Sequence, residues 1–481
     1  VVHLNRRPPY RIFLLALLLP ASLWANPFDL YGAGARGGAM AGALSSAASD
    51  HSAVYYNPAA LTLRDAHMAA GFTTTLDRVR IEMKPRPGGY DLPDLGSGSV
   101  KIPSGDRLHL RQDVNDIPNV YGFTLGAVGS FGLKNLRIGV HVLLPVNGLG
   151  SQVSRFPDER EQYFSNQLDF EMIGQRSQHQ VIMVAIAYRL YPWLSLGAGI
   201  SIMPSVTTNS DVYIDDPGQQ ERIELALQTN QVGRAAPTAG VLVGPFADLT
   251  FSLAYRGANY LGMELHNNVQ IRGFEGDDDT FPIQQVSTIV VDYSPDQYTV
   301  GGNWRRGNLL VAMDLLWSVW FNYINHQGET PRDFDNTLSV RLGGEYKTAD
   351  DVLFRFGLGW EPSPVPEQSG RTNYVDNDRL VATIGAGHSI ELFGRPVSVS
   401  WYVQLQHLFA QEVDKLRLDP APACAKGVAA LCDEIDDATL DPATGRIVPQ
   451  YQGLQTGNPG FPGWLAYGEL LAFGIELGWA L

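Results

Sequence analysis

Hydrophobic and polar residues alternate along most of the chain from about residue 66 onward. In the last segment Leu471, Phe473, Ile475, Leu477, Trp479 and Leu481 share one face, while Ala472, Gly474, Glu476, Gly478 and Ala480 share the other. A period of two is typical of a strand with one face in lipid. We predict fourteen strands, near 66–84, 118–130, 135–146, 179–190, 193–208, 235–245, 248–271, 286–303, 308–323, 336–347, 351–361, 379–392, 396–410 and 465–481.

The connections between these strands alternate between short and long. Short turns fall at Phe131–Lys134, Tyr191–Pro192, Phe246–Ala247, Trp304–Gly307, Thr348–Asp350 and Phe393–Arg395. Outer-membrane barrels have short periplasmic turns and longer external loops, whereas a soluble sandwich is not expected to keep such an alternation. Residues 64–481 are therefore predicted to form a transmembrane antiparallel β-barrel, an all-β fold.

The composition agrees with a membrane barrel and argues against a nucleic-acid partner. Charged residues make up 18% of the 481, below the ~25% of soluble domains. No apolar stretch after the first residues is long enough for a transmembrane helix. The net charge of −15 would repel phosphates, so we expect no binding of nucleic acid.

The first 25 residues have the pattern of an export signal. Arg6, Arg7 and Arg11 form a basic region, and Ile12–Leu23 is an apolar run too short to span a bilayer. We expect residues 1–25 to be a signal peptide cleaved after Ala25, although Leu23 is large for the position three residues before the cut.

Residues 26–63 lack the strand alternation and are rich in glycine and alanine. One interpretation is a flexible periplasmic tail. The other, which we favour, is a small N-terminal hatch (plug) folded inside the lumen, because a barrel of fourteen strands leaves space to fill.

Several segments resemble the FadL/TodX family of outer-membrane transporters for long-chain fatty acids and aromatic hydrocarbons. The segments that carry the resemblance are 28–43, 50–61, 139–145, 196–199, 254–257, 314–318, 343–346, 353–357, 362–366 and 376–379. The most specific is Asn57-Pro58-Ala59, which resembles the family's hatch motif. Two features depart from the family: the chain ends in Leu481 where an aromatic residue is usual, and the loop 411–464 is long.

The resemblance implies uptake of long-chain fatty acids by passive diffusion through a plugged barrel in the cell outer membrane, with lateral release into the membrane. It implies no cofactor. We expect a monomer that contacts outer-membrane lipid and lipopolysaccharide. Uptake of aromatic or aliphatic hydrocarbons is the alternative within the family, and a general hydrophilic porin is the alternative from another class. No hydrolase, zinc-protease or phosphate-loop motif is present, so we do not expect an enzyme.

Alternation directs several charged residues toward the predicted lumen. The candidate ligand-binding residues are Arg256, Arg355, Arg137, His141 and Arg341, with Arg256 and Arg355 favoured for contact with a substrate. A guanidinium group suits the carboxylate of a fatty acid. Alternation also directs Asp314, Glu345 and Glu391 toward the lumen, and the alternative is a structural network in which the arginines pair with acids to hold the plug against the wall.

Two further features of the sequence concern loops and strand ends. Cys424 and Cys432 lie close together in an exported chain, so we expect a disulfide rather than a metal site, because no histidine is nearby. Aromatic residues at strand ends are expected to form interfacial girdles: Tyr191, Trp193, Trp304, Trp317, Trp320 and Trp360.

Overall fold

The computed structural model describes most of the chain outside the N-terminus and the longest loops. The described residues are 31–84, 113–114, 119, 121–146, 155–156, 168–172, 181–203, 206–213, 222–232, 234–272, 281–370, 373–392, 394–416 and 459–480. The predicted signal peptide, residues 26–30 of the predicted hatch and the predicted pair Cys424 and Cys432 lie outside these residues.

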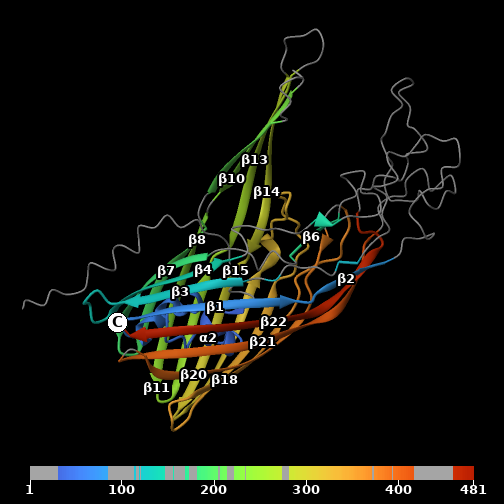
Figure 1. Ribbon diagram of the computed structural model, residues 1–481. Helices are drawn as coiled ribbons and strands as arrows, with labels where there is room; N and C mark the ends of the chain where they lie inside the picture. Colours follow the sequence, from blue (N-terminus) through green and yellow to red (C-terminus); the bar gives the residue numbers. More distant parts are fainter. Residues whose placement is uncertain are drawn as a thin grey trace, which may run out of the picture.

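One antiparallel sheet closes on itself to form a barrel (Figure 1). In spatial order its strands are β1 (His67–Asp77), β3 (Tyr121–Gly129), β4 (Leu136–Pro145), β7 (Val181–Tyr191), β8 (Leu194–Met203), β11 (Arg234–Phe246), β12 (Leu249–Arg256), β15 (Asp296–Arg306), β16 (Leu309–Val319), β17 (Thr337–Lys347), β18 (Leu353–Glu361), β20 (Arg379–Leu392), β21 (Arg395–Asp414) and β22 (Gly463–Ala480). Closure comes from β1, which pairs with both β3 and β22. The short β2 (Arg80–Met83) continues beyond β1 and also pairs with β22. The described residues thus confirm the predicted fourteen-stranded barrel.

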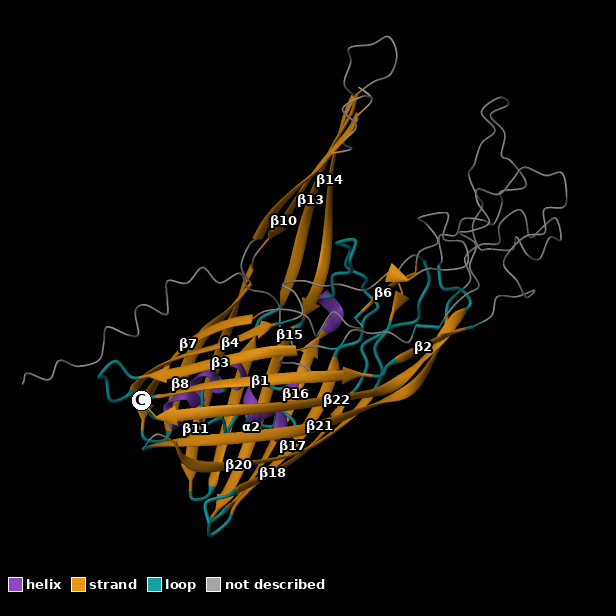
Figure 2. Ribbon diagram, viewed as in Figure 1, coloured by secondary structure: helices purple, strands orange, loops and turns teal. Residues whose placement is uncertain are grey.

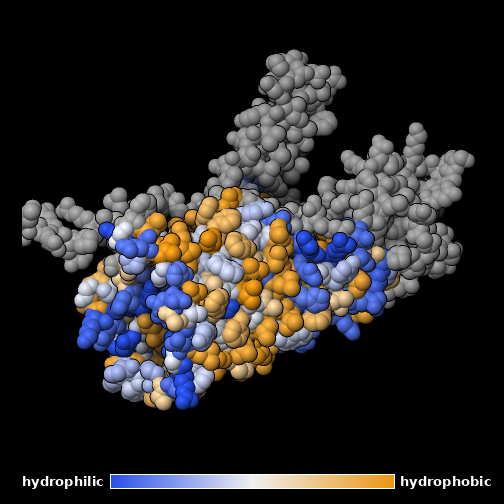
Figure 3. All heavy atoms as spheres, turned by 60° about the horizontal axis from the view of Figure 1, so that its bottom comes forward, coloured by the Kyte–Doolittle hydropathy of each residue, from blue (hydrophilic) through white to orange (hydrophobic). Residues whose placement is uncertain are grey.

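Successive side chains of each strand point alternately into the lumen and outward. On β16, Ala312, Asp314 and Leu316 are buried, whereas Leu315 and Trp317 are exposed. On the face shown in Figure 3, exposed hydrophobic side chains gather between hydrophilic regions at the two ends of the barrel. None of the described helices is long and apolar enough to cross a membrane.

A second sheet extends beyond one end of the barrel (Figure 1). It contains β9 (Val206–Tyr213), β10 (Arg222–Val232), β13 (Asn259–Arg272) and β14 (Phe281–Ser294), in the order β14-β13-β10-β9. The predicted strand 248–271 is therefore two strands, β12 in the barrel and β13 outside it, and 286–303 likewise divides into β14 and β15. The sequence pattern did not mark these divisions, because paired strands alternate in the same way within and beyond the wall.

Short elements pack together at the same end of the barrel as the long connections. A small sheet joins β5 (Arg155–Phe156), β6 (Leu168–Glu171) and β19 (Asn373–Tyr374). The predicted strand 308–323 ends early, because the chain turns into the 3-10 helix η6 (Trp320–Asn322) after β16. Trp320 is consequently 7% exposed, and its predicted role in an interfacial girdle is wrong.

Residues 31–64, which we call the N-terminal segment, fold separately from the wall. They form α2 (Gly34–Ala39), α3 (Ala53–Tyr56) and η2 (Pro58–Leu63), and Figure 2 shows these helices inside the ring of strands. The largest cluster of buried apolar residues joins this segment to inward-facing residues of the wall, with Leu44, Val54 and Leu61 on one side and Met183 and Leu310 on the other. The main hydrophobic core of the described chain is thus in the lumen.

Candidate functional site: the lumen and its external mouth

Glycines on the inner wall make room for the N-terminal segment. A Cβ added at Gly240 of β11 would lie 1.9 Å from Oδ1 of Asn57, and one added at Gly126 of β3 would lie 2.0 Å from the His51 ring. At Gly139 of β4 it would lie 2.7 Å from side-chain atoms of Val54 and Leu61. The inner surface of the wall therefore matches the shape of the segment at several strands.

The motif Asn57-Pro58-Ala59 fixes the path of the N-terminal segment. Nδ2 of Asn57 donates to the carbonyl oxygens of Ser45 at 2.9 Å and Val241 at 3.1 Å, and Oδ1 accepts from the Ala59 N–H at 3.0 Å. Pro58 begins η2, where a missing N–H costs nothing. Asn57 therefore connects two parts of the segment to β11.

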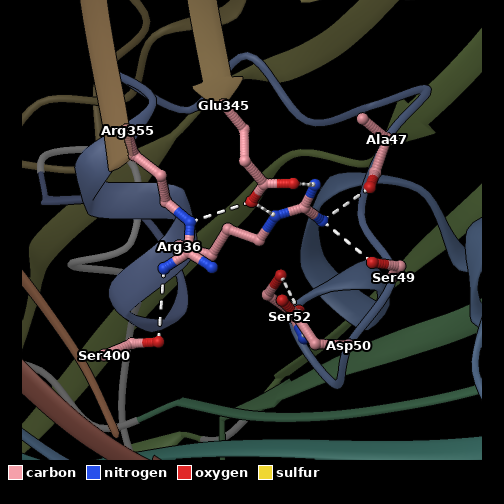
Figure 4. A network of polar contacts seen from close by, with 8 residues as sticks. All are labelled: Arg36, Ala47, Ser49, Asp50, Ser52, Glu345, Arg355 and Ser400. Atoms are coloured by element: carbon pink, nitrogen blue, oxygen red, sulfur yellow. Dashed lines mark hydrogen bonds and ion pairs between the residues drawn. The ribbon is translucent and has the colours of Figure 1, made fainter. Parts of the chain in front are cut away.

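Wall carboxylates provide two further anchors. Asp314 of β16 accepts from the N–H and the hydroxyl of Ser45 at 2.8 and 2.6 Å. Glu345 of β17 pairs with Arg36 of α2 and with Arg355 of β18, in each case with a 2.9 Å contact to Nε (Figure 4). All of these groups are buried, where an unpaired charge would be costly, so both anchors depend on complete pairing.

The five candidate ligand-binding residues do not form one site. Arg355 is held by Glu345 and by Oγ of Ser400 at 3.2 Å. Arg256 lies over the ring of Tyr55, 3.9 Å from its centroid, and donates to Gln297. These two favoured arginines thus contact the N-terminal segment or the wall network.

The other three candidates lie at different heights in the barrel. Arg137 is near a short turn, where it donates to the Arg64 carbonyl at 2.8 Å and to Asp65 at 3.0 Å. His141 is fully buried against His51, with ring centroids 4.8 Å apart. Of the five candidates, Arg341 is the one that lines the larger of the two lumen pockets described below.

This pocket lies where β15, β16, β17, β18 and β20 meet the long connections. It is lined by Tyr293, Ser294, Pro295, Gln297, Leu316, Ser318, Trp320, Thr337, Ser339, Arg341, Glu361, Pro362, Pro364, Asp376 and Arg379. The pocket is partly open to solvent, and its empty space, the adjoining solvent included, is about 590 Å³.

The charges around the pocket cancel. Glu361 bridges Arg341 at 2.6 Å and Arg379 at 3.2 Å, and Asp376 lies 3.6 Å from Arg379. Among the described lining residues, two guanidinium groups thus face two carboxylates. The sequence pattern identified Arg341 as a candidate but not Glu361, Asp376 and Arg379. These three residues lie at or near strand ends, where alternation no longer shows whether a side chain points into the lumen or outward.

An aromatic cluster adjoins the pocket on its external side. It consists of Met172, Tyr293, Trp320, Tyr323, Phe334 and Tyr374. Tyr323 is central: its ring centroid lies 4.4 Å from that of Phe334 and 5.8 Å from that of Tyr374. Its hydroxyl donates to the buried Glu171 at 2.7 Å, which ties η6 to β6. Tyr293 and Trp320 belong to both the cluster and the pocket.

A second, smaller cavity separates the start of the N-terminal segment from β1, β3 and β22. Its lining includes Tyr31, Ala35, Thr73, Tyr402 and Glu476. The described residues contain no group of three or more histidines, cysteines or acids arranged to hold a metal ion.

The closed antiparallel wall, its exposed hydrophobic belt and its densely packed lumen define an outer-membrane β-barrel. Residues 162–399 match the family described as "Outer membrane protein transport protein (OMPP1/FadL/TodX)". The resemblance seen in the sequence is confirmed: over about half of its length the chain is similar to the FadL/TodX outer-membrane transport proteins.

A relative from Marinobacter nauticus and two solved structures are also similar to this chain. Alkane uptake protein A of Marinobacter nauticus is 25% identical over 389 residues, which cover 74% of this chain and 78% of that protein. The fold is similar to that of a Pseudomonas aeruginosa FadL homologue, with a TM-score of 0.57, 15% identity and coverage of 93% and 98% of the two chains. It is also similar to the P. putida toluene transporter TodX, with a TM-score of 0.50, 11% identity and coverage of 94% and 99%.

Proposed function

We propose that this protein takes up uncharged hydrophobic molecules, such as aliphatic or aromatic hydrocarbons, across the outer membrane. The observation that carries this choice is the cancelled charge of the larger pocket, where Glu361 already pairs with both Arg341 and Arg379. A neutral ligand leaves these pairs intact. A carboxylate would have to displace Glu361 or Asp376, and removing one partner from a buried pair is costly.

Long-chain fatty acids, the ligands first expected from the family resemblance, are the second candidate. They are supported by the presence of two arginines in the pocket, because guanidinium groups bind carboxylates through paired hydrogen bonds. The printed description of the Marinobacter relative as an alkane uptake protein supports the first candidate instead.

The route we propose begins at the aromatic cluster around Tyr323, whose rings suit an apolar molecule arriving from outside. The molecule then enters the adjoining pocket, which shares Tyr293 and Trp320 with the cluster. The N-terminal segment acts as the hatch, and its movement connects this pocket with the cavity beside Tyr31 and Tyr402. Release is lateral, into the membrane, because an apolar molecule is more stable there than in the aqueous periplasm. Transport is downhill and requires no cofactor or enzymatic step, and the transporter acts as a monomer that contacts outer-membrane lipid and lipopolysaccharide.

Binding of matched ligands tests the choice of substrate. A saturated alkane and the fatty acid of the same chain length are titrated against the purified protein in detergent. Ligand binding to protein-free detergent micelles is measured separately and subtracted. We expect tighter binding of the alkane. Tighter binding of the fatty acid, lost on raising the salt concentration, would instead support the second candidate.

Deletion of residues 26–63 tests the hatch. The strands close without this segment, so the shortened protein should fold, shift its gel mobility on heating as an intact barrel does, and conduct ions in planar bilayers. A folded but impermeable deletion variant would contradict the hatch assignment.

A further inference from the structure

Three imidazole rings meet where the N-terminal segment contacts the wall. His51 belongs to the segment, His67 to β1 and His141 to β4. The centroid of the His51 ring lies 4.8 Å from that of His141 and 5.7 Å from that of His67. Their exposed fractions are 1% for His51, 4% for His67 and 0% for His141, so the cluster is shielded from bulk water.

A hydrogen bond across this junction depends on the protonation state of His67. The backbone N–H of His51 donates to Nε2 of His67 at 3.2 Å, so this nitrogen must carry a lone pair. The other ring nitrogen, Nδ1, lies 3.4 Å from the carbonyl oxygen of Asp65, which suits a neutral ring with its proton on Nδ1. A second proton on His67 would place an N–H against an N–H and break the contact.

Charged groups lie near the cluster on several of the elements packed around it. On the segment these are Asp50 and Arg36; before β1 they are Arg64 and Asp65; on β22 and β18 they are Glu476 and Arg355. Nε2 of His51 lies 3.5 Å from Glu476. Oδ1 of Asp50 is already bound by both the N–H and the hydroxyl of Ser52.

The remaining neighbour, β3 (Tyr121–Gly129), carries no acidic, basic or histidine residue. Gly126 allows the His51 ring to lie directly against the strand. Asp50 and Glu476 each accept hydrogen bonds from groups outside the cluster, and imidazolium charges gained by neighbouring rings of the cluster would repel one another.

We propose that His51, His67 and His141 form an acid-sensitive latch that holds the N-terminal segment against β1 and β4 and releases it when the cluster gains protons. This latch rests on the proposed role of the segment as a hatch. The seated state holds His67 without its second proton, whereas a histidine exposed to water gains one near pH 6.5. The released state thus binds more protons, so seating is stable above about pH 6.5 and is lost as the pH falls below it.

Single-channel conductance of the full-length protein in planar bilayers, measured between pH 8 and pH 4.5, tests the latch. The wild type should be closed at pH 8. Its open probability should then rise with acidification, by up to about tenfold per pH unit for each proton taken up. His67→Gln offers a carbonyl oxygen to the His51 N–H and cannot gain a proton, so it should stay closed at pH 4.5.

Two further variants make the result decisive. His407→Gln changes an exposed histidine of β21 outside the cluster and should keep the wild-type pH response. His141→Gln removes one facing ring and should reduce the pH response; it serves as the test if His67→Gln does not show the gel shift of a folded barrel. An unchanged pH response in a folded cluster variant, or a wild type insensitive to pH, would overturn the latch. The 26–63 deletion separates this from the hatch, because it should conduct at every pH if the hatch assignment holds.

Discussion

Ser45 binds both oxygens of the Asp314 carboxylate, with its N–H at 2.8 Å from Oδ2 and its hydroxyl at 2.6 Å from Oδ1. These residues are far apart in the sequence, one in the N-terminal segment and one in β16, and both are buried. Because a charged acceptor strengthens each hydrogen bond, this contact is one of the main attachments of the segment to the wall.

Asp314→Asn should weaken this attachment, because asparagine has nearly the same size as aspartate but carries no charge. The amide nitrogen of the new residue would face a donor of Ser45, so one charge-assisted hydrogen bond is lost, about 1.5–3 kcal/mol. The unseated population should rise about 10- to 150-fold. Ion conductance in bilayers measures this increase, and Asp350→Asn, in an exposed turn, is the control that should leave conductance unchanged.

Gly240→Ala should displace the N-terminal segment by steric conflict. The added methyl would lie 1.9 Å from Oδ1 of Asn57, so the segment must move. Gly302→Ala on β15 is the matched control, because its methyl would make an ordinary 3.5 Å contact with Phe251. We expect both proteins to show the gel shift of a folded barrel and only Gly240→Ala to conduct ions. Equal conductance of the two variants would contradict the close fit between segment and wall.

Glu361→Gln should alter which ligands bind in the larger pocket. Removing this carboxylate leaves Asp376 as the one acidic residue among the described residues that line the pocket, so the pocket gains one net positive charge. The affinity for a long-chain fatty acid should rise about tenfold or more, the value of a new charge-assisted hydrogen bond. The affinity for an alkane of equal length should change little. Titration of both ligands against both proteins checks this, and a loss of both affinities would mean that Glu361 mainly holds the pocket in shape.

Tyr323→Phe should weaken the external aromatic cluster while keeping its ring. The buried Glu171 would lose the 2.7 Å hydrogen bond from the Tyr323 hydroxyl, a cost of about 1–3 kcal/mol. Uptake should slow most at low ligand concentration, where capture limits the rate, and little at saturation. Tyr346→Phe, on an exposed part of β17, is the control; slowing that is equal at all concentrations would argue against a role in capture.

The predicted disulfide between Cys424 and Cys432 can be checked by alkylation. The non-reduced protein should resist thiol reagents, and reduction should leave the barrel folded, because so short a loop contributes at most about 3 kcal/mol. Free thiols in protein taken directly from the outer membrane would contradict the prediction.

Alternation along the chain predicted the barrel because each wall strand meets lipid on one face and the lumen on the other. It did not separate β12 from β13, since Leu249–Arg256 and Asn259–Arg272 are both paired antiparallel strands. The boundary between them depends on where the barrel ends in space, and a local pattern does not contain that information.

The inward direction of Arg355, Arg341 and Asp314 could also be predicted from alternation. Their partners could not. Arg36 and Glu345 are separated by 309 positions, and only the closed barrel brings them to 2.9 Å. Sequence reasoning therefore named charged residues of the lumen but could not distinguish ligand contacts from the attachments of the N-terminal segment.

The glycines at 126, 139 and 240 lie on the inner wall at the positions where side chains of the N-terminal segment come closest to it. The inner wall and the segment are therefore complementary in shape, and a larger side chain on one of them requires a compensating change on the other. A chimaera that receives the segment of a relative should seat it only if the facing glycines and the Asp314 and Glu345 contacts are exchanged with it. Substitutions in this family should accordingly accumulate in compensating pairs across the lumen.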